Sequence, residues 1–566
     1  MELENLNKSN SRDSEPNNLT RSDSFRRDIS IPGPLWNTLE FYIYYALFLI
    51  VVPYMMYGVV QLSSDQLPNY QYYEQRLKQG WMFNRKFDNS DHQYSQFRNN
   101  VPILTGVAVG YIILSKLVQG MFTKPRESIP RFWTNFTPTK SYFYLIFNTV
   151  FLSVLHGSSV LKLFGILLIN FYLTKLMGKF KWSPAVSFIF NFVVLILADL
   201  YQGFKFSSLS DSLSFLDEHK GILERWYIHF NITTLRLISW SFDYHWALTS
   251  SDKIEDYKTE LNTNKLRANQ NSPLKSFNLV NYFAYVLYAP LYLAGPIITY
   301  NDWYHQVKNG NKNVTKSLLI KRGLNLLGCM LLMEWMLHYV YVMAISKSQA
   351  YQGYSPFQLT MVGFFNLKFI WLKLLVMWRF FRYWSLLDGI EPIENMGRCM
   401  SNNYSIQGFW KGWHCSYNRW IVRYMYIPLG GDKYPYLNIW PIFTFVAIWH
   451  DTSFQLLAWG WLISLFFIPE LLAVQLTKPL RRKKYFRHLK AAGGALNVFA
   501  LCAANLVGFA LGTEGIQKLI RMLSTMDGLL FLIITYACLF VGVQLMIEIR
   551  NSELRAYHRN KLRNSD

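Results

Sequence analysis

Residues 437–469 read LNIWPIFTFVAIWHDTSFQLLAWGWLISLFFIP, and this stretch decides the class of fold. It contains two apolar runs, Leu437–Trp449 and Phe454–Pro469, with a histidine and an aspartate in the short segment between them. Apolar runs of this kind fit the hydrocarbon core of a bilayer. His450 is therefore expected near the middle of sequence that is compatible with a membrane interior. An ionisable residue in such a place is a functional hypothesis by default.

The composition of the whole chain also indicates a membrane protein. Of the 566 residues, 51% are hydrophobic, 17% are aromatic and only 16% are charged, whereas soluble domains carry roughly 25% charged residues. No long polar linker separates two globular compositions. The length therefore indicates one domain with many membrane segments rather than several soluble domains.

Apolar runs that approach the roughly 20 residues needed to cross a bilayer recur along the chain. We predict an all-α polytopic membrane protein, a bundle of about ten to twelve membrane segments in which the shorter ones are re-entrant. An aromatic amphipathic segment is expected around 226–246. The predicted segments are Phe41–Gln61, Val101–Phe122, Tyr142–Leu155, Val160–Met177, Pro184–Tyr201, Phe277–Ile298, Leu318–Ile345, Phe357–Trp384, Leu437–Trp449, Phe454–Val474, Ala491–Leu511 and Leu529–Ile547.

Three regions follow from this pattern. Residues 1–33 are rich in Asn, Ser, Arg and Asp and are expected to form a disordered polar tail. Residues 34–550 form the multi-span domain, with a catalytic region at about 277–475, and residues 551–566 form a basic cytosolic tail. The first apolar run begins after Pro34, too far along for a cleaved secretory signal, so it predicts a signal anchor.

The net charge of +22 raises the question of a nucleic-acid partner. Most of the charge lies next to apolar runs, a placement that the positive-inside rule explains better, so no nucleic acid is expected as a partner. Two predicted spans separate the two main clusters, so both are expected to face the cytosol. The clusters are Lys478, Arg481, Arg482, Lys483, Lys484, Arg487 and Lys490, and Arg550, Arg555, Arg559, Lys561 and Arg563.

Two histidines, His414 and His450, are the leading catalytic candidates. A histidine has an unperturbed pKa of about 6.5, and burial favours the neutral ring, which then has a nitrogen free to accept a proton. The structural alternative is a core histidine that is satisfied by a backbone carbonyl. If 410–421 is one helix, Asn418 lies on the same face as His414. A carboxylate beside a buried imidazole fixes its tautomer, and Asp388 and Asp451 are the candidates for that position.

The basic residues beside His414 suggest a contact for a polar substrate. Arg419 and Arg423 are spaced i and i+4, so on a helix they form a plausible clamp for phosphates. The alternative is an interfacial helix whose cations reach lipid headgroups. The sequence Pro-Leu-Gly-Gly at 428–431 is expected to break the helix at membrane depth, which is tolerated only inside protein or beside a cavity.

Other chemistries fit the same stretch less well. His414, Cys415, His450 and Asp451 do not match the usual spacing of metal ligands, so no metal is expected. The five cysteines show no CxxC pair. Acyl transfer through Cys415 needs an adjacent base, and the side chain of its neighbour His414 would point about 100 degrees away on a helix.

Several motifs carry a family resemblance. They are FWKGWHCSYNRW at 409–420, RYMYIPLGG at 423–431, IWHD at 448–451, YAPLYLAGPII at 288–298 and FFRYWSLLDG at 380–389. The chain resembles the membrane-bound O-acyltransferase (MBOAT) family over roughly 36–550. Within that family it is similar to the yeast Gup (glycerol uptake) branch, which is related to Hedgehog acyltransferase.

The resemblance implies an active site in a membrane-embedded tunnel and an acyl-CoA co-substrate, with no bound cofactor. It places the invariant family histidine at His450, as the base that takes the acceptor proton, and the second polar position at His414. His414 and Asn418 would then orient substrate or stabilise developing charge. Substrate contacts are expected at Asn418, Arg419, Arg423, Trp449 and Tyr426.

The Gup-like resemblance further implies a lipid acceptor of the lysophosphatidylinositol type, within glycosylphosphatidylinositol (GPI) anchors. Its setting would be the membrane of the endoplasmic reticulum, with the plasma membrane as a further location. Two other functions stay open. One is proton-coupled glycerol uptake, although the unusual chemistry occurs once rather than in paired halves, as in secondary transporters. The other is a catalytically silent scaffold.

Overall fold

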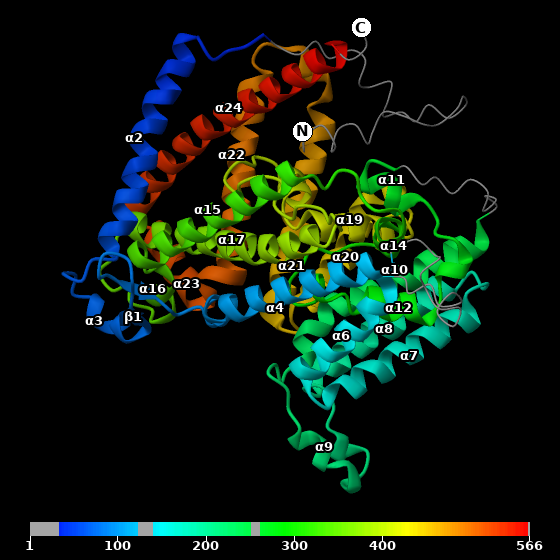
Figure 1. Ribbon diagram of the computed structural model, residues 1–566. Helices are drawn as coiled ribbons and strands as arrows, with labels where there is room; N and C mark the ends of the chain where they lie inside the picture. The colour runs from blue at the N-terminus through cyan, green and yellow to red at the C-terminus, as the bar shows by residue number, and fades with distance from the viewer. Residues whose placement is uncertain (1–32, 123–139, 251–260, 564–566) are drawn as a thin grey trace, which may run out of the picture.

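The computed structural model describes residues 33–122, 140–250 and 261–563, and this part of the chain is mostly helical (Figure 1). Its sheet is a small antiparallel hairpin of β1 (Leu77–Gln79) and β2 (Lys86–Asp88). Residues 1–32 of the predicted polar tail lie outside the described residues. Residues 551–563 of the predicted basic tail continue the last helix. The fold is all-α, as predicted.

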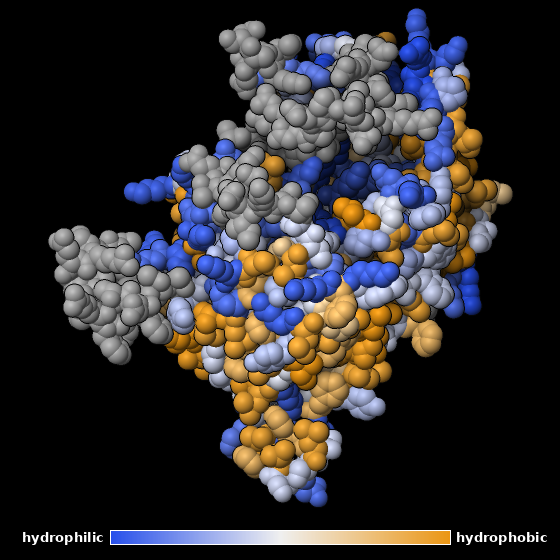
Figure 2. Space-filling model, turned by 90° about the vertical axis from the view of Figure 1, so that its right-hand side faces the viewer, coloured by the Kyte–Doolittle hydropathy of each residue, from blue (hydrophilic) through white to orange (hydrophobic). Residues whose placement is uncertain are grey.

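Eight of the described helices are long and apolar enough to cross a membrane. Many of their large apolar side chains are exposed, an arrangement that suits contact with lipid. Figure 2 shows hydrophobic residues over the lower and right-hand parts of one face, and hydrophilic residues around a hollow in its upper half. The helices are α2 (Leu39–Leu62), α4 (His92–Phe122), α7 (Ser159–Met177), α8 (Ser183–Leu200), α17 (Pro356–Leu387), α21 (Phe454–Leu476), α22 (Phe486–Asn505) and α24 (Met526–Arg563).

The other four predicted segments are also helical, but they are short, interrupted or less apolar. Tyr142–Leu155 lies in α6 (Lys140–His156) and Leu437–Trp449 in α20 (Pro435–His450). The remaining two segments each divide in two. They give α12 (Leu279–Val286) and α13 (Ala289–Tyr292), and α15 (Lys316–Tyr339) and α16 (Val342–Lys347).

Proline and glycine explain the break in the predicted segment 277–298. Pro290 lies in the first turn of α13, where a missing N–H costs nothing. Pro296 follows Gly295, and the chain is non-helical from there to Thr299 although Ile297 is buried. Irregular backbone inside a membrane protein is tolerated where other parts of the protein surround it. The burial of Ile297 shows that this stretch is surrounded in that way.

Two helices form the centre of the bundle. In α17, 67% of the residues in the most apolar 18-residue stretch are buried, whereas the value is at most 33% in each of the other seven spanning helices. In α10 (Trp226–Thr249), every residue from Thr233 to His245 is buried. The prediction of an amphipathic segment here was therefore wrong, because α10 packs against α7, α8, α12 and α14 and has no solvent-facing side in this stretch.

Shorter helices connect these elements. They are α3 (Tyr70–Tyr73), α9 (Phe215–Glu218), α11 (Asn264–Asn269), α14 (Tyr300–Asn309), α18 (Ile406–Gly412), α19 (Cys415–Ile421) and α23 (Gly512–Leu523). In Figure 1, α19 and α14 lie to the right of the long helices α15 and α17, and α20 lies with them. The packing of α20 against α21 joins this group to the C-terminal helices.

The two basic clusters of the C-terminal third lie on the same side of the molecule. Helices α22 and α24 pack together, and Arg487 at the start of α22 donates to the Oε1 of Gln544 on α24 at 2.9 Å. Arg487 also pairs with Glu40 near the start of α2 at 2.5 Å. The expectation that both clusters share one side of the membrane is consistent with this contact.

A buried carboxylate ties the end of α17 to the N-terminal helices. The hydroxyls of Tyr111, Tyr144 and Tyr288 donate to the Oδ2 of Asp388 at 3.1, 2.7 and 2.7 Å, and Ser115 donates to its Oδ1 at 2.8 Å. The residue is 6% exposed. Asp388 was one of two candidates to orient an imidazole, and that hypothesis was wrong, because its oxygens accept from hydroxyl groups of α4, α6 and the α12–α13 connection.

Candidate active site

The chain turns sharply at His414. Helix α18 ends at Gly412, Trp413 is extended with φ −98° and ψ 131°, and His414 has a left-handed backbone with φ 45° before α19 begins at Cys415. The single helix over 410–421 that the sequence left open is therefore not formed. His414 stands at the junction of two short helices, and we call residues 412–415 the elbow.

Hydrogen bonds to a neighbouring segment explain why the helix breaks. Trp413 forms a bridge with Met396, and the Gly397 N–H donates to the carbonyl of Gly412 at 2.9 Å. The Cys415 N–H donates to the carbonyl of Asn395 at 2.9 Å. These hydrogen bonds replace those of a continuous helix. They therefore offset the cost of the left-handed backbone at His414, a conformation that non-glycine residues seldom adopt.

A carboxylate from a spanning helix fixes the start of α18. Glu470 on α21 accepts from the Ser405 hydroxyl at 2.7 Å and from the Ile406 N–H at 2.6 Å. It thus satisfies a backbone donor that the first turn leaves unpaired and places negative charge at the positive end of the helix. Glu470 is 9% exposed. The elbow is therefore held from both sides, by Glu470 through α18 and by Asn395.

Replacing Glu470 with alanine should weaken this anchor. Two acceptors at the start of α18 are lost, so we expect the free energy of unfolding to fall by about 1–2 kcal/mol. Thermal unfolding in detergent measures the change. Gln475→Ala, an exposed position on the same helix, is the control. Equal stability of the two variants would show that Glu470 does not hold α18.

His450 is the last residue of α20, and its side chain is exposed. Asp451 is extended, with φ −172°, and α21 begins at Phe454 after the Ser453 cap. The histidine therefore lies at the junction of two helices rather than inside a span. His414, by contrast, is only 9% exposed. Within the described ranges neither imidazole forms a hydrogen bond, and Asp451 forms no ion pair with His450.

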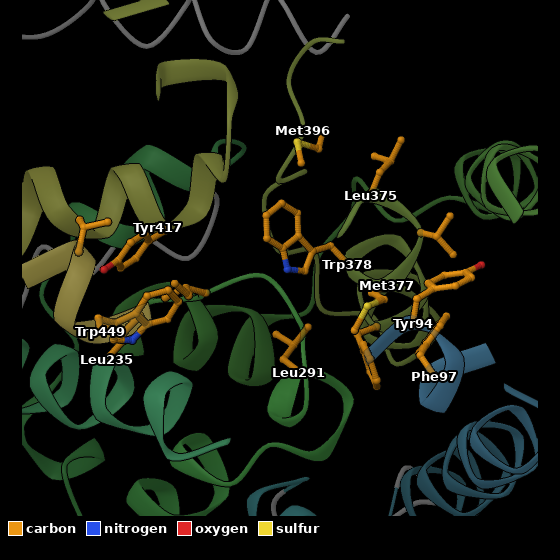
Figure 3. Close-up of a cluster of buried hydrophobic side chains, with 14 of the residues drawn as sticks. Tyr94, Phe97, Leu235, Leu291, Leu375, Met377, Trp378, Met396, Tyr417 and Trp449 are labelled. Carbon is orange, nitrogen blue, oxygen red and sulfur yellow. The ribbon is translucent and has the colours of Figure 1, made fainter. Parts of the chain in front are cut away.

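Trp449 lies between the two histidines. Its ring centroid is 6.1 Å from that of His414 and 4.8 Å from that of His450. Tyr417 lies against Trp449, as Figure 3 shows, and the two rings stack with centroids 4.4 Å apart. Trp378 of α17 stacks on His414, also with centroids 4.4 Å apart. The two imidazoles thus belong to one aromatic cluster that joins α17, α19 and α20.

Asn231 of α10 fixes the position of Trp449. The Trp449 indole N–H donates to the Asn231 carbonyl at 2.8 Å, and the Asn231 amide donates to the Trp449 carbonyl at 2.7 Å. Because Trp449 precedes His450, this pair of bonds also sets where α20 ends. The geometry leaves an exposed imidazole on a rigid support, which suits a group that exchanges protons with a substrate.

Comparison with known proteins identifies the family. The family model for MBOAT, the membrane-bound O-acyltransferase family, matches residues 167–513. The chain belongs to the membrane-bound O-acyltransferase family. Membrane-bound O-acyltransferase GUP1 of Candida tropicalis is 42% identical over 93% of this chain and 89% of its own length. Membrane-bound O-acyltransferase GUP1 of Saccharomyces cerevisiae is 40% identical over 92% of both chains.

A distant relative extends the similarity within the membrane-bound O-acyltransferase family. Protein-cysteine N-palmitoyltransferase HHAT of Mus musculus is 29% identical over 31% of this chain and 37% of its own length. The resemblance to the Gup branch, with a distant link to the Hedgehog acyltransferase branch, is confirmed. The protein is thus an O-acyltransferase of the membrane, and its family implies an acyl donor and a lipid or protein acceptor.

The two arginines of this MBOAT chain have different partners. Arg423 donates to the buried Asp243 of α10 at 3.0 Å and stacks over Trp246 at 4.7 Å. Arg419 donates to the amide oxygen of Asn264 on α11 at 2.8 Å. The charge of Arg423 is thus paired with a buried carboxylate, whereas Arg419 forms a hydrogen bond to a neutral group.

Two further predicted substrate contacts lie on the same segment. Asn418 is half-buried on α19, and its side-chain amide bonds to no described residue. Tyr426 ends the π-helical turn Val422–Tyr426 and donates to Asp432 at 2.7 Å. Gly430 and Gly431 then adopt positive φ of 99° and 56°, so the predicted break at 428–431 is confirmed.

Cys415 has the properties of a structural thiol. It lies outside the eight spanning helices, is 5% exposed, and its Sγ is 3.3 Å from the Lys411 carbonyl. Burial raises the pKa of the thiol, and the thiolate, not the thiol, is the nucleophile. Across the part of the chain that the structure describes, no group of three or more His, Cys, Asp and Glu is placed to hold a metal.

Sequence reasoning missed three residues that position this site. Asn231 lay in the segment predicted around 226–246 without a role of its own, Glu470 was read as part of an apolar run, and Asn395 was not singled out. The one usable signal was the carboxylate of Glu470 beside Pro469, because a charge inside a predicted span needs a partner. Nothing in the local sequence marks Asn231 or Asn395.

Proposed function

We propose that this protein transfers a long acyl chain from acyl-CoA to a lipid hydroxyl, with His450 as the general base. The observation that supports it most directly is the exposed His450 ring, without a hydrogen-bond partner among the described residues, held at the end of α20 by the Trp449–Asn231 bonds. A base needs an unoccupied ring nitrogen within reach of the acceptor.

The reaction is a direct transfer. His450 removes the proton from the acceptor hydroxyl while its oxygen attacks the thioester carbonyl carbon. The C–S bond then breaks, an ester forms, and the coenzyme A sulfur leaves and takes up the proton. His414 and Asn418 orient the substrates or stabilise the developing negative charge on the carbonyl oxygen. No acyl-enzyme intermediate is needed, which agrees with the buried, protonated thiol of Cys415.

We assign the remaining predicted substrate contacts to different roles according to the residues that they contact. Trp449 and Tyr426 flank the path of the acceptor in this proposal. Arg419 is the candidate contact for a donor phosphate, because its present partner, Asn264, is neutral and exchangeable. We assign Arg423 to the support of the site through Asp243. Acyl donor and acceptor then meet at the exposed side of the aromatic cluster.

For the acceptor we propose a lysophosphatidylinositol-type lipid in GPI anchors, remodelled in the endoplasmic reticulum. The similarity to the Gup branch supports this choice, and the eight helices that are long and apolar enough to cross a membrane suit a lipid acceptor. The plasma membrane is a second setting in which such lipids occur.

The test is acyl transfer by purified, reconstituted protein. Labelled long-chain acyl-CoA is offered with lysophosphatidylinositol or with other lysophospholipids, and the labelled products are separated by chromatography. We expect transfer that depends on acyl-CoA and favours the inositol lipid. Transfer to another acceptor would contradict the proposed acceptor and leave the proposed acyl transfer in place. No transfer to any acceptor, with proton-dependent glycerol flux in the same vesicles, would replace the proposal with a transporter.

A further inference from the structure

The exposed ring of His450 stands on the short junction between α20 and α21, residues 450–453. The ring itself bonds to no described residue, so its position depends on how the junction is held. The Trp449–Asn231 bonds fix the residue before it to α10. Two further contacts hold the residues that follow His450, and they come from α8 and from the end of α22.

Asp199 of α8 holds the junction through Thr452. The Thr452 hydroxyl donates to the Oδ2 of Asp199. Asp199 lies in the last turn of α8, and α8 packs against α10, the helix that carries Asn231. The residue two positions after His450 is therefore tied to the same pair of helices as the residue before it.

The carboxylate of Asp199 does not stabilise its own helix. A negative charge in the last turn of a helix is unfavourable, because the C-terminal end of the helix dipole is itself negative. Across the described ranges Asp199 forms no ion pair that would compensate for this placement. The bond to Thr452 is thus the contact that accounts for an acidic residue at this position.

Gln455 in the first turn of α21 provides the third contact. Its side-chain amide donates to the carbonyls of Val507 and Gly508 at 3.0 and 3.1 Å. These carbonyls belong to the π-helical turn Leu506–Ala510, which directly follows α22. The start of α21 is therefore tied to a third part of the bundle, separate from α8 and α10.

Trp459 of α21 connects the π-helical turn to the imidazole. Its ring centroid lies 6.2 Å from that of His450 and 5.1 Å from that of Phe509. A Cβ added at Gly508 would lie 2.8 Å from the indole, so the glycine allows this close approach. π-helical turns are found frequently at functional sites. The His450 ring thus lies next to a segment that Gln455 anchors.

We propose that Asp199 and Gln455 are positioning residues for acyl transfer, which hold the junction 450–453 so that the His450 ring meets the acceptor hydroxyl. This inference rests on the proposed role of His450 as the base. Asp199 acts through Thr452, and Gln455 acts through the start of α21. A displacement of about 1 Å at a reacting group can lower a rate about 100-fold. Contacts that take no part in the chemistry therefore affect the rate.

The experiment measures both acyl transfer and the mobility of the junction. Asp199→Ala removes the acceptor for Thr452, so we expect kcat to fall about ten-fold while the KM for acyl-CoA and the unfolding temperature stay at their wild-type values. Hydrogen–deuterium exchange of peptides that cover 446–457 should become faster, because the junction opens more often. Gln455→Ala should act in the same way, and the two changes together should lower kcat about 100-fold.

Conservative variants separate positioning from a general loss of structure. Asp199→Asn keeps an oxygen that accepts from the Thr452 hydroxyl, so it should restore most of the transfer that Asp199→Ala loses. Thr452→Val removes the hydroxyl and keeps the shape of the side chain, so it should reproduce the loss, and Thr452→Ser should restore transfer. Asp199→Ala combined with Thr452→Val should be no worse than either change alone, since both break one bond.

Matched controls come from exposed positions elsewhere. Asp211→Ala removes an exposed carboxylate from the segment that follows α8, and Gln475→Ala truncates an exposed glutamine near the other end of α21. Both variants should keep the wild-type kcat and the wild-type exchange of 446–457. A loss in either control equal to that in the test variants would show that removal of any polar side chain has this effect, and would overturn the proposal.

Two other results would also contradict the proposal. Wild-type exchange in both Asp199→Ala and Gln455→Ala would show that the junction is held without them. Equal loss in Asp199→Asn and Asp199→Ala would show that the charge matters and not the bond to Thr452. Absence of transfer by the wild type, or full transfer by His450→Ala, would instead contradict the proposed function, and faster exchange in Asp199→Ala would still show that Asp199 holds the junction.

Discussion

Replacing His450 with alanine is expected to leave the protein folded and to lower kcat/KM for acyl transfer roughly 100- to 10,000-fold, the usual contribution of a general base. The side chain is exposed and bonds to no described residue, so its removal leaves no buried group unpaired. The measurement is acyl transfer by reconstituted protein, with the unfolding temperature of the same sample as the check on folding.

Two comparisons make this result specific. His92→Ala removes an exposed histidine at the start of α4 and should keep full activity. His414→Ala should also lower transfer, but it removes a buried ring that stacks on Trp378, so its unfolding temperature should fall too. Full transfer by His450→Ala would remove this residue from the chemistry and leave His414 as the candidate base.

Arg423→Ala is expected to be the most destabilising change near the site. It leaves the buried carboxylate of Asp243 without its guanidinium partner, and breaking a buried pair in this way costs about 3–5 kcal/mol. Arg419→Ala removes a bond to a neutral amide and should cost about 1 kcal/mol. Unfolding of the two variants in detergent, side by side, measures the difference.

The same pair of variants separates support from substrate binding. If Arg423 holds α10 against the segment after α19, Arg423→Ala loses stability, and Arg419→Ala instead raises the KM for acyl-CoA. The opposite pattern, a stable Arg423→Ala with a raised KM, would restore the two-arginine phosphate clamp that the sequence suggested. Asp243→Asn then serves as a check, since it neutralises the partner and should spare much of the loss in Arg423→Ala.

The sequence predicted the membrane segments well because their signal is local. Length and hydropathy are properties of consecutive residues, so eight of the twelve predicted segments coincide with helices that are able to cross a membrane. The break near Pro290 and Gly295 was also foreseeable, since proline and glycine act on their own backbone. Helix α10 was misread because its aromatic pattern resembles that of an interfacial helix, and only its packing partners show that it is buried.

The candidate site was only partly predictable because its geometry depends on distant contacts. The left-handed backbone of His414 arises from bonds to Asn395, and Trp449 is fixed by Asn231, 218 positions away. Arg423 finds Asp243 at a separation of 180. Motifs pointed to the candidate residues, but no local pattern states which of them pair. The candidate histidines could therefore be picked out from the sequence, whereas the residues that hold them in place could be recognised only in the structure.

The hydroxyl groups around Asp388 have a consequence for how the chain enters the membrane during synthesis. Tyr111, Ser115, Tyr144 and Tyr288 all precede Asp388, and chains are made and fold from the N-terminus. When α17 leaves the ribosome, the donors for its terminal carboxylate are already made. An unsolvated carboxylate is costly in an apolar medium. Because of this order, the hydroxyl groups that bond to Asp388 are already in the chain when the central helix is inserted, so its carboxylate need not stay unpaired.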